Sequence, residues 1–534
     1  MNTEPLFIAS DAASGSITAE LAGSKAAELA HMARLGLDVP PAFVLPTTLC
    51  AGVNAGEAHA MQAMERGLAR GIAWLEERTG RRFGDSRAPL LVSVRSGAAI
   101  SMPGMLQTVL DIGLNEQSVH GLMRLSGNPR LAFDSWRRLI QSHAEVVGHV
   151  APARFDAALA EMIHGEQVEG ESELDSEALE RLAAAYRDVA LRFGHVVPDD
   201  PRRQLADAAR AVFQSWQAPR AVEYRTLNRL SDEGGTAVTV QAMVFGNSGP
   251  RSGAGVIFSR NPATGADEPY LDFLFDAQGE DVVSGRRTPI DAARLRARLP
   301  DVARKLIDGV RHIERASRDA QDVEFTVEEG RLYFLQTRSA KRTPLAALRM
   351  AVAMVHEGLI DRQTALARLD TLDLARLAVR RFADQAAPAA QAISAAPGVA
   401  SGRIAFSSAR AKELAKESDP VILVRPDTST EDVAGFGVAE GILTTVGGRT
   451  AHAAVVARQL GKVCLVGCRA LAVDEAHSEA TLSGVRLREG DWLSLDGDAG
   501  SVVPGKRTIV SEPPAELAEV MDWRGAFTAE PAGR

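Results

Sequence analysis

The segment Thr444–Arg458, TTVGGRTAHAAVVAR, constrains the fold of this chain more than any other. It ends the short apolar run GILTT, turns at the glycine pair Gly447–Gly448 and continues from Ala453 as an Ala/Val-rich helical run. The next apolar run is KVCLVG. Alternation of short strands with a helix is typical of a compact α/β domain.

His452 stands between this glycine turn and the helical run, so its imidazole is predicted to lie at a helix N-terminus. Free amide N–H groups there favour a phosphoryl group. A neutral imidazole is also a good nucleophile near pH 7. His452 is therefore a candidate phosphohistidine, and the alternative is a capping or half-buried structural histidine.

The rest of the chain predicts a multidomain protein that combines α+β and α/β parts. Residues 1–340 mix short strands, Gly-rich turns and helices, which favours a two-lobed nucleotide-binding unit with a helical insertion at about 150–215. Pro344–Arg381 resembles a helical hairpin interrupted by Gly358, and the Ala/Pro-rich stretch Asp384–Ala400 is typical of a semi-extended linker. The predicted divisions are a nucleotide-binding domain (1–340), a hairpin and linker (341–390), a carrier domain (391–506) and a tail (507–534) that contains an amphipathic stretch, Ala515–Phe527.

Composition excludes several classes of protein. A length of 534 residues is too great for one core, and a formal charge of −9 with scattered basic residues makes nucleic acid an unexpected partner. Three cysteines form neither a disulfide framework nor a zinc site. No basic leader and no apolar run of about 18 residues is present, so we expect a cytoplasmic protein without membrane spans.

The segment Asp322–Arg338 predicts a β-hairpin with chemistry on one face. A three-residue loop, Glu328–Gly330, with a left-handed glycine is a common connection. The resulting register places four polar side chains on one face: Asp322, Glu324, Gln336 and Arg338. Carboxylate and amide oxygens suit Mg²⁺, and an arginine neutralises charge on a triphosphate. A two-residue loop would split these groups, and the structural alternative is the polar outer face of an edge hairpin.

Other candidates lie near strand ends and glycine turns. Lys25 follows Gly23-Ser24 at a helix start, and Arg95 follows the strand LLVSV, so both are placed to contact phosphates. Residues 246–255, GNSGPRSGAG, form a candidate Gly-rich lid that includes Gly253 and Gly255. Gln241 and Met243 alternate along a preceding strand and are candidates for an adenine pocket, with core packing as the alternative for Met243.

Several long stretches resemble one family. GGRTAHAAVVARQLGKVCLVG is similar to the phosphohistidine segment of enzymes that use phosphoenolpyruvate, most closely that of the pyruvate, phosphate dikinase family. VSVRSGAAISMPGMLQTVLDIGLN, NPRLAFDSWRRLIQ, TAVTVQAMVFGNSG, SRNPATG, AQGEDVVSGRRTP and LQTRSAKRT resemble its nucleotide domain in the same order. The resemblance covers nearly the whole chain and is weakest at residues 150–210 and in the tail.

This resemblance implies an ATP-grasp domain followed by a swivelling phosphohistidine domain. It implies Mg²⁺, with ATP and phosphate as substrates. The implied nucleotide, metal and phosphate residues are Lys25, Arg95, Arg138, Gln241, Met243, Gly253, Gly255, Glu280, Asp322, Glu324, Gln336 and Arg338. Arg138 is a candidate for inorganic phosphate. Thr450 matches a position that is regulated by phosphorylation in some relatives, and helix capping is its alternative.

The implied reaction begins when His452 attacks the β-phosphorus of MgATP and releases AMP. Inorganic phosphate then removes the outer phosphoryl group as pyrophosphate. The family's C-terminal barrel, which binds pyruvate and phosphoenolpyruvate, would begin near Arg534, so we expect the acceptor on another chain. A homodimer is expected by resemblance only. The alternatives are a water-dependent donor of the phosphoenolpyruvate synthase type and a non-catalytic ATP-binding regulatory protein.

Overall fold

The computed structural model of this chain describes residues 3–11, 17–100, 108–228, 230–231, 234–283, 290, 292–374, 377–427, 432–448, 452–475 and 477–529. The chain divides into two compact units. Unit 1 comprises Met1–Pro250 and Tyr333–Thr337, and unit 2 comprises Arg251–Leu332 and Arg338–Arg534. None of the helices in the described ranges combines the length and apolar character that crossing a membrane requires. The domain limits expected from the sequence stay a prediction.

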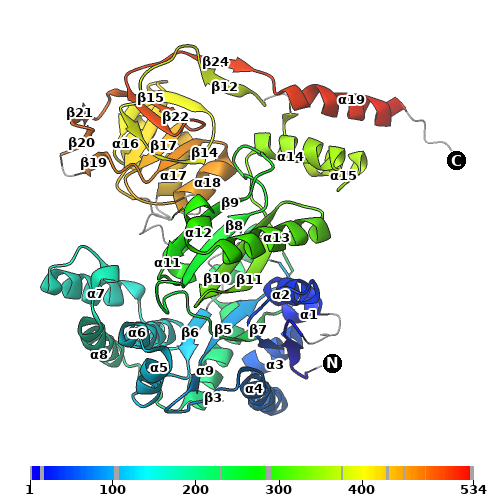
Figure 1. Ribbon diagram of the computed structural model, residues 1–534, viewed down its shortest axis with the longest axis vertical. Helices are drawn as coiled ribbons and strands as arrows, with labels where there is room; N and C mark the ends of the chain where they lie inside the picture. Colours follow the sequence, from blue (N-terminus) through cyan, green and yellow to red (C-terminus); the bar gives the residue numbers. More distant parts are fainter. Residues whose placement is uncertain are drawn as a thin grey trace. The chain divides into compact units, whose positions relative to one another are not determined.

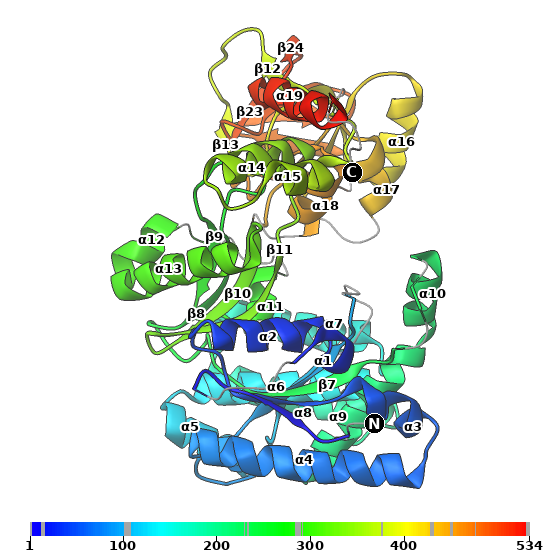
Figure 2. The same cartoon turned by 90° about the vertical axis from the view of Figure 1, so that its right-hand side faces the viewer.

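A five-stranded antiparallel sheet forms the centre of unit 1. In spatial order its strands are β1 (Leu6–Ile8), β2 (Ala42–Leu45), β7 (Ala237–Ala242), β5 (Val92–Gly97) and β6 (Thr108–Ile112). Alternate residues, among them Phe43, Val94 and Val240, are fully buried on one face. Helix α4 (Ala58–Thr79) packs closely there because Gly71 lies on the Phe43 ring, where a Cβ atom would come within 2.4 Å. Helix α2 (Ser24–Arg34) lies on the other side of the sheet (Figure 2).

The remaining helices of unit 1 build the core around this sheet. They are α1 (Ala19–Ala22), α3 (Cys50–Asn54), α5 (Ser118–Ser126), α6 (Pro129–Val146), α7 (Pro152–Glu166), α8 (Ser176–Arg192), α9 (Pro201–Gln214) and α10 (Pro219–Leu227). Two short strands, β3 (Arg82–Phe83) and β4 (Pro89–Leu90), form a parallel pair and lie between α4 and β5 in the sequence. The stretch for which the sequence predicts a helical insertion, 150–215, consists mainly of α7, α8 and α9.

A four-stranded sheet in the order β11, β10, β8, β9 belongs mainly to unit 2, whereas the centre of β11, Tyr333–Thr337, is counted with unit 1. Its strands are β8 (Gly253–Phe258), β9 (Tyr270–Phe275), β10 (Gln321–Glu328) and β11 (Arg331–Ser339). Helices α12 (Ala292–Arg298) and α13 (Pro300–Ser317) pack on it, and α11 (Gly279–Val283) precedes them (Figure 1). In α13 the buried residues recur at helical spacing, as Val302, Leu306, Val310 and Ile313.

The hairpin between β10 and β11 differs from the prediction. Its loop has two residues, Glu329 and Gly330, with φ angles of +49° and +81°, so the predicted three-residue loop is wrong. Two positive φ angles are the geometry favoured in two-residue hairpins. Glu329 adopts this unfavourable backbone with help from Ser252, whose Oγ accepts from the Glu329 N–H at 2.9 Å and donates to its carboxylate at 3.2 Å.

A helical layer follows this sheet along the chain. Helices α14 (Pro344–His356) and α15 (Arg362–Leu369) form the expected hairpin, and Gly358 ends α14 with a φ of +69°. Helix α19 (Ala515–Ala529) packs on both of them, where Val520 and Trp523 are almost fully buried. The amphipathic stretch expected near the C-terminus is therefore this helix.

An eight-stranded sheet forms the last part of unit 2. In spatial order its strands are β13 (Ala390–Gln391), β23 (Ser501–Pro504), β22 (Trp492–Asp496), β15 (Val399–Ala405), β16 (Val421–Arg425), β17 (Gly441–Thr444), β18 (Val463–Val466) and β14 (Ile393–Ala396). The central strands β15 to β18 are parallel. Helices α16 (Ser408–Lys416), α17 (Val433–Val438) and α18 (His452–Leu460) cover one face (Figure 1). We call residues 390–504 the carrier part.

Smaller elements complete the carrier part. The three-stranded sheet β19 (Leu471–Asp474), β20 (Glu479–Leu482) and β21 (Val485–Arg488) contributes to the core on the other face. Strands β12 (Val379–Phe382) and β24 (Ile509–Glu512) pair antiparallel where the chain enters and leaves the carrier part.

The prediction of a semi-extended linker at Asp384–Ala400 is wrong for its second half. Strands β13 and β14 and the start of β15 lie in the eight-stranded sheet, and Ile393 pairs with Val466. The alanines at 395, 396 and 400 are fully buried. Small side chains allow close packing in this core, so a scarcity of large apolar residues did not indicate exposure.

Candidate functional site

The start of α2 lies directly against the end of β5 in unit 1. The Ser24 N–H donates to the Ala98 carbonyl at 2.8 Å, and a Cβ atom on Gly23 would come within 2.3 Å of the Gly97 carbonyl carbon. Gly23 also has a φ of +79°, so glycine is required there. This junction places Lys25 in the first turn of α2, two residues beyond Gly23.

Arg95 lies on the sheet face that points away from α4. It pairs with Thr239, as Ser93 pairs with Gln241, whereas Val94 faces the core. Arg95 is half-buried, and Gln241 is only 4% exposed, with its amide donating to the Pro40 carbonyl at 3.5 Å. Two residues predicted to contact nucleotide therefore share one face of the central sheet.

Met243 follows β7, and its N–H donates to the Leu91 carbonyl at 2.9 Å. Its side chain packs partly buried against the core of unit 1. This is the packing alternative that the sequence left open for Met243, and an additional contact with a base stays a prediction.

Arg138 belongs to a buried charge cluster on α6. Its Nε lies 3.0 Å from Asp134 Oδ2, and its Nη2 lies 3.5 Å from a Glu171 oxygen. Its neighbour Arg137 is more deeply buried and pairs with the same two carboxylates, at 2.7 Å for Asp134 Oδ1. Asn247 donates to Asp134 Oδ2 at 3.1 Å and so connects the Gly-rich segment to the cluster.

The two arginines decide the ionisation of Asp134. Burial acts to raise the pKa of this carboxyl, but Arg137 and Arg138 together hold the pKa well below its ordinary value. Sequence reasoning found nothing local to distinguish Arg138 and missed its partners. The signal was the spacing of Asp134 from Arg137 and Arg138, three and four residues along a helix. Binding of inorganic phosphate by Arg138 stays a prediction.

Gly253 and Gly255 lie inside β8, so the segment predicted as a lid ends before them. Cβ atoms at these positions would come within 2.2 Å of the Phe273 ring and 2.7 Å of the Phe325 ring. Both glycines are therefore needed for packing between strands and aromatic side chains. The prediction of a loop over 246–255 is wrong at its end, and phosphate binding by these two residues is untested.

Asp322 and Glu324 occupy alternate positions on β10, and so lie on one face of the four-stranded sheet. Arg338 donates from Nε to Asp322 Oδ2 at 2.7 Å. The other carboxylate oxygen, Asp322 Oδ1, is buried and has no hydrogen-bond partner among the described residues. A two-residue loop was expected to split the four predicted residues, but the structure still brings Asp322 and Arg338 together. Gln336 lies on β11, and a common face for all four stays a prediction.

Burial raises the pKa of the Asp322 carboxyl, while Arg338 opposes this shift. Burial lowers the pKa of the Arg338 guanidinium, but Asp322 and Glu324 raise it by more, so the pKa lies above its ordinary value. A buried anionic oxygen without a partner is costly, and a cation would satisfy it. Mg²⁺ is commonly held by one or two carboxylates together with substrate phosphates. Asp322 and Glu324 fit that ligand set, although the described residues contain no cluster of three or more His, Cys, Asp or Glu side chains suited to a metal.

Three predicted positions fall partly or wholly outside what the structure describes. Helix α18 begins at His452, as the sequence predicts, but the His452 side chain is outside the described residues. Thr450 also lies outside them. Glu280 lies on α11, and its side chain is not among those described.

Arg458, which sequence reasoning missed, lies six residues after His452 on the same helix. It is 1% exposed, donates to the Ala395 carbonyl at 2.9 Å and lies 5.7 Å from the centre of the Phe258 ring. Burial lowers the pKa of its guanidinium, while nearby acidic groups that include Asp272 and Asp322 oppose the shift. Arg458 thus connects α18 with the strands β14 and β8.

The chain is similar to proteins of one family over most of its length. The family model "Pyruvate phosphate dikinase, AMP/ATP-binding domain" matches residues 54–305, and "PEP-utilising enzyme, mobile domain" matches 417–500. Pyruvate, phosphate dikinase of Clostridium symbiosum is 41% identical over 514 residues, 95% of this chain and 59% of that protein. Pyruvate, phosphate dikinase 2 of Zea mays is 43% identical over 512 residues, 94% of this chain and 58% of that protein. For the chloroplastic pyruvate, phosphate dikinase 1 of Arabidopsis thaliana the identity is 41% over 515 residues, 95% of this chain and 53% of that protein. The chain therefore spans between half and three fifths of the length of these relatives.

Proposed function

Because the chain belongs to the pyruvate, phosphate dikinase family, we propose that it catalyses the half-reaction in which ATP and inorganic phosphate become AMP and pyrophosphate. His452 becomes phosphorylated in this reaction. It then passes the phosphoryl group to an acceptor site outside residues 1–534. The names of the relatives make pyruvate the first acceptor to test. A homodimer stays a prediction.

The proposed chemistry proceeds in two displacements. A ring nitrogen of His452 attacks the β-phosphorus of ATP; the N–P bond forms as the bond to the α,β-bridging oxygen breaks, and AMP leaves. An oxygen of inorganic phosphate then attacks the outer phosphorus, pyrophosphate departs and one phosphoryl group stays on the imidazole. Each step needs the negative charge of the phosphates to be neutralised.

This chain's own residues have distinct roles in the proposal. Arg338 neutralises charge on the transferred group, and Lys25 and Arg95 hold phosphate oxygens. Asp322 and Glu324 would hold Mg²⁺, which when bound withdraws charge from the phosphate oxygens. Arg138 binds inorganic phosphate in this proposal. The residues that contact the nucleotide are Gln241, Met243, Gly253, Gly255, Glu280 and Gln336.

The observation that carries the proposal is the carboxylate of Asp322. One oxygen accepts from Arg338 at 2.7 Å, and the other is buried without a hydrogen-bond partner in the described structure. A purely structural ion pair would normally satisfy both oxygens, whereas a metal site leaves one oxygen available to the cation. This arrangement supports phosphoryl transfer over simple packing.

The test uses ATP labelled at the β-phosphate, with Mg²⁺ and with or without inorganic phosphate. Wild type should acquire acid-labile label and release AMP, and pyrophosphate should appear when phosphate is added. His452→Ala should acquire no label. Asp301→Asn, which changes an exposed carboxylate on α13, is the matched control and should behave as wild type. Absence of label and AMP from the wild type would contradict the proposal and favour the ATP-binding regulatory alternative.

The second candidate uses water in place of phosphate, as in phosphoenolpyruvate synthases. The same assay separates the two reactions, because water would yield AMP and two phosphates without pyrophosphate. The stretches RSGAAISMPGM and NPRLAFDSWRRLIQ resemble the dikinases more closely than the synthases, so we rank phosphate first as the second substrate.

A further inference from the structure

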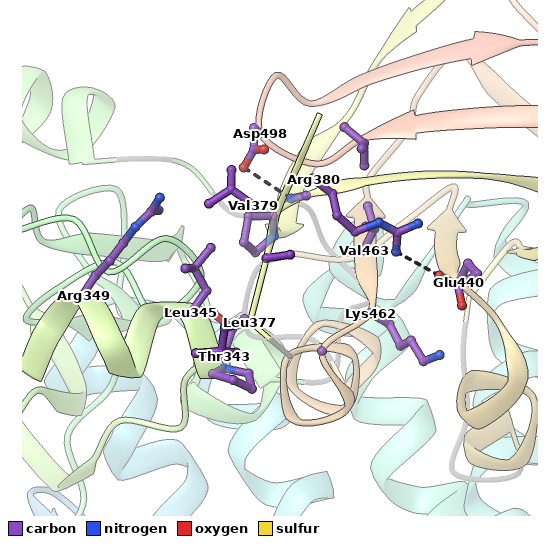
Figure 3. A pocket seen from close by; sticks show the side chains of 16 residues that line it. Thr343, Leu345, Arg349, Leu377, Val379, Arg380, Glu440, Lys462, Val463 and Asp498 are labelled. Atoms are coloured by element: carbon purple, nitrogen blue, oxygen red, sulfur yellow. Dashed lines mark hydrogen bonds and ion pairs between the residues drawn. The ribbon is translucent and has the colours of Figure 1, made fainter. Parts of the chain in front are cut away.

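A cavity of about 390 Å³ lies within unit 2, between the start of α14, strand β12 and the edge of the eight-stranded sheet (Figure 3). Its volume falls in the range of pockets that bind small molecules. The described residues that line it include none of those predicted for ATP, metal or phosphohistidine. The cavity is thus separate from the site described above.

Its walls combine cationic and apolar groups. Arg349 comes from α14, Arg380 from β12 and Lys462 from the turn before β18, so three separate segments each contribute a positive charge (Figure 3). Leu345 and Val463 supply apolar surface between them. Such walls suit a ligand that has both an anionic group and an apolar body.

Two of the three cations already have acidic partners. Arg349 Nε lies 3.3 Å from a Glu516 oxygen, and its Nη1 donates to the Thr264 carbonyl at 3.0 Å. Glu440 pairs with Arg380 at 3.1 Å. Asp498 accepts from the Gly398 N–H at 3.3 Å, and burial raises the pKa of its carboxyl. Lys462 forms no ion pair within the described part of the chain. The N-terminus of α14, a helix of 13 residues, also lines the cavity and adds positive potential.

We propose that this cavity binds a small organic anion, with a carboxylate held by Lys462 and an apolar body against Leu345 and Val463. The occupant contacts α14, the strand β12 by which the chain enters the carrier part, and the carrier sheet itself. It therefore fastens the carrier part to α14. The occupant thereby slows delivery of the phosphoryl group. This effect rests on the proposed function, whereas the binding itself does not.

Benzoate is the probe, because it has one carboxylate on a compact apolar ring, and benzamide is its neutral counterpart. Calorimetry on the full chain without ATP should show saturable benzoate binding and no benzamide binding. Lys462→Ala should weaken benzoate binding by about fivefold, the loss expected for one partly exposed charge pair. Ala378→Phe changes an exposed lining residue and fills the cavity without altering charge, so it should abolish binding.

Lys412→Ala is the matched control, because Lys412 is exposed on α16 and does not line the cavity. It should bind benzoate as wild type does. Hydrogen exchange should also show protection of 377–380 and 461–463 when benzoate is present, which places the ligand.

Failure of benzoate to bind the wild type would overturn the inference, as would binding that Lys462→Ala and Ala378→Phe leave unchanged. Equal binding of benzamide would overturn the anionic class. Labelling of His452 is measured separately, so intact labelling without benzoate binding contradicts this inference alone. Intact binding without labelling contradicts the proposed function alone.

Discussion

Arg338 donates to Asp322 Oδ2 at 2.7 Å while the other oxygen of the same carboxylate remains buried without a hydrogen-bond partner in the described structure. One carboxylate thus both fixes the arginine and keeps an oxygen available. In the proposed reaction a metal bound there would lie beside the Arg338 guanidinium, so this pair would organise the reacting end of the nucleotide.

Asp322→Asn should abolish most turnover and leave the fold intact. The amide oxygen still accepts from Arg338, but the neutral side chain is a poor ligand for Mg²⁺. We expect AMP formation to fall by about a hundredfold or more, the scale of losing one key electrostatic contact. AMP release and thermal unfolding should be measured together, with Asp301→Asn as control. Turnover near that of wild type would remove Asp322 from the metal site.

Arg458→Ala should destabilise unit 2. The substitution leaves the Ala395 carbonyl without its donor and empties space beside Phe258 in a region that is almost fully buried. We expect a loss of about 2–4 kcal/mol in the free energy of unfolding. Urea unfolding followed by circular dichroism measures it. The exposed Arg469→Ala is the control, and equal stability of the two variants would show that the Arg458 contacts contribute little.

His143 should make unit 1 less stable as the pH falls. Burial, followed by the charge of His195, lowers its pKa to about 3, and His143 Nδ1 lies 3.0 Å from His195 Nε2. In the unfolded chain this imidazole has a pKa of about 6.5, so it takes up a proton at a pH where the folded-state imidazole is still neutral. The contribution of neutral His143 to folding stability is therefore complete above pH 6.5 and is lost as the pH falls towards 3. The expected slope is about 1.4 kcal/mol per pH unit.

Chemical denaturation at several pH values between 7 and 4 tests this linkage. His143→Asn should lower the slope by about one proton. His120→Asn, which alters an exposed histidine on α5, should keep the slope of the wild type. An unchanged slope in His143→Asn would mean that His143 is protonated in the folded state.

Gly253→Ala should reduce stability, because its Cβ atom would come within 2.2 Å of the Phe273 ring and 2.5 Å of the Leu274 carbonyl oxygen. Because the Leu274 backbone in the neighbouring strand cannot easily move away, we expect the free energy of unfolding to fall by about 1–3 kcal/mol. Gly437→Ala on α17, where nothing lies within 4 Å of the new Cβ, is the control and should be stable. A Gly253→Ala variant with normal stability but a raised KM for ATP would instead favour the phosphate-binding role.

Local sequence patterns predicted the elements of the site well. The start of α18 at His452, the strands around it and the hairpin of β10 and β11 all follow from glycine turns and alternating apolar residues, which act over a few positions. The two-residue loop was missed because Ser252, far away in sequence, holds Glu329 in its unusual backbone conformation. The predicted linker failed at β14 because its alanines are buried by β18, a strand some seventy residues later.

The sequence by itself determined which residues we propose to carry the chemistry, since His452, Asp322, Glu324 and Arg338 are singled out by spacing and family resemblance. It also determined the period of each strand and helix, because apolar repeats act locally. Only the tertiary structure decided the partners: which oxygen of Asp322 meets Arg338, how Glu171 reaches Arg137 and Arg138, and which elements line the cavity. These depend on contacts between residues distant in sequence and on burial, which strongly changes the energy of a charge.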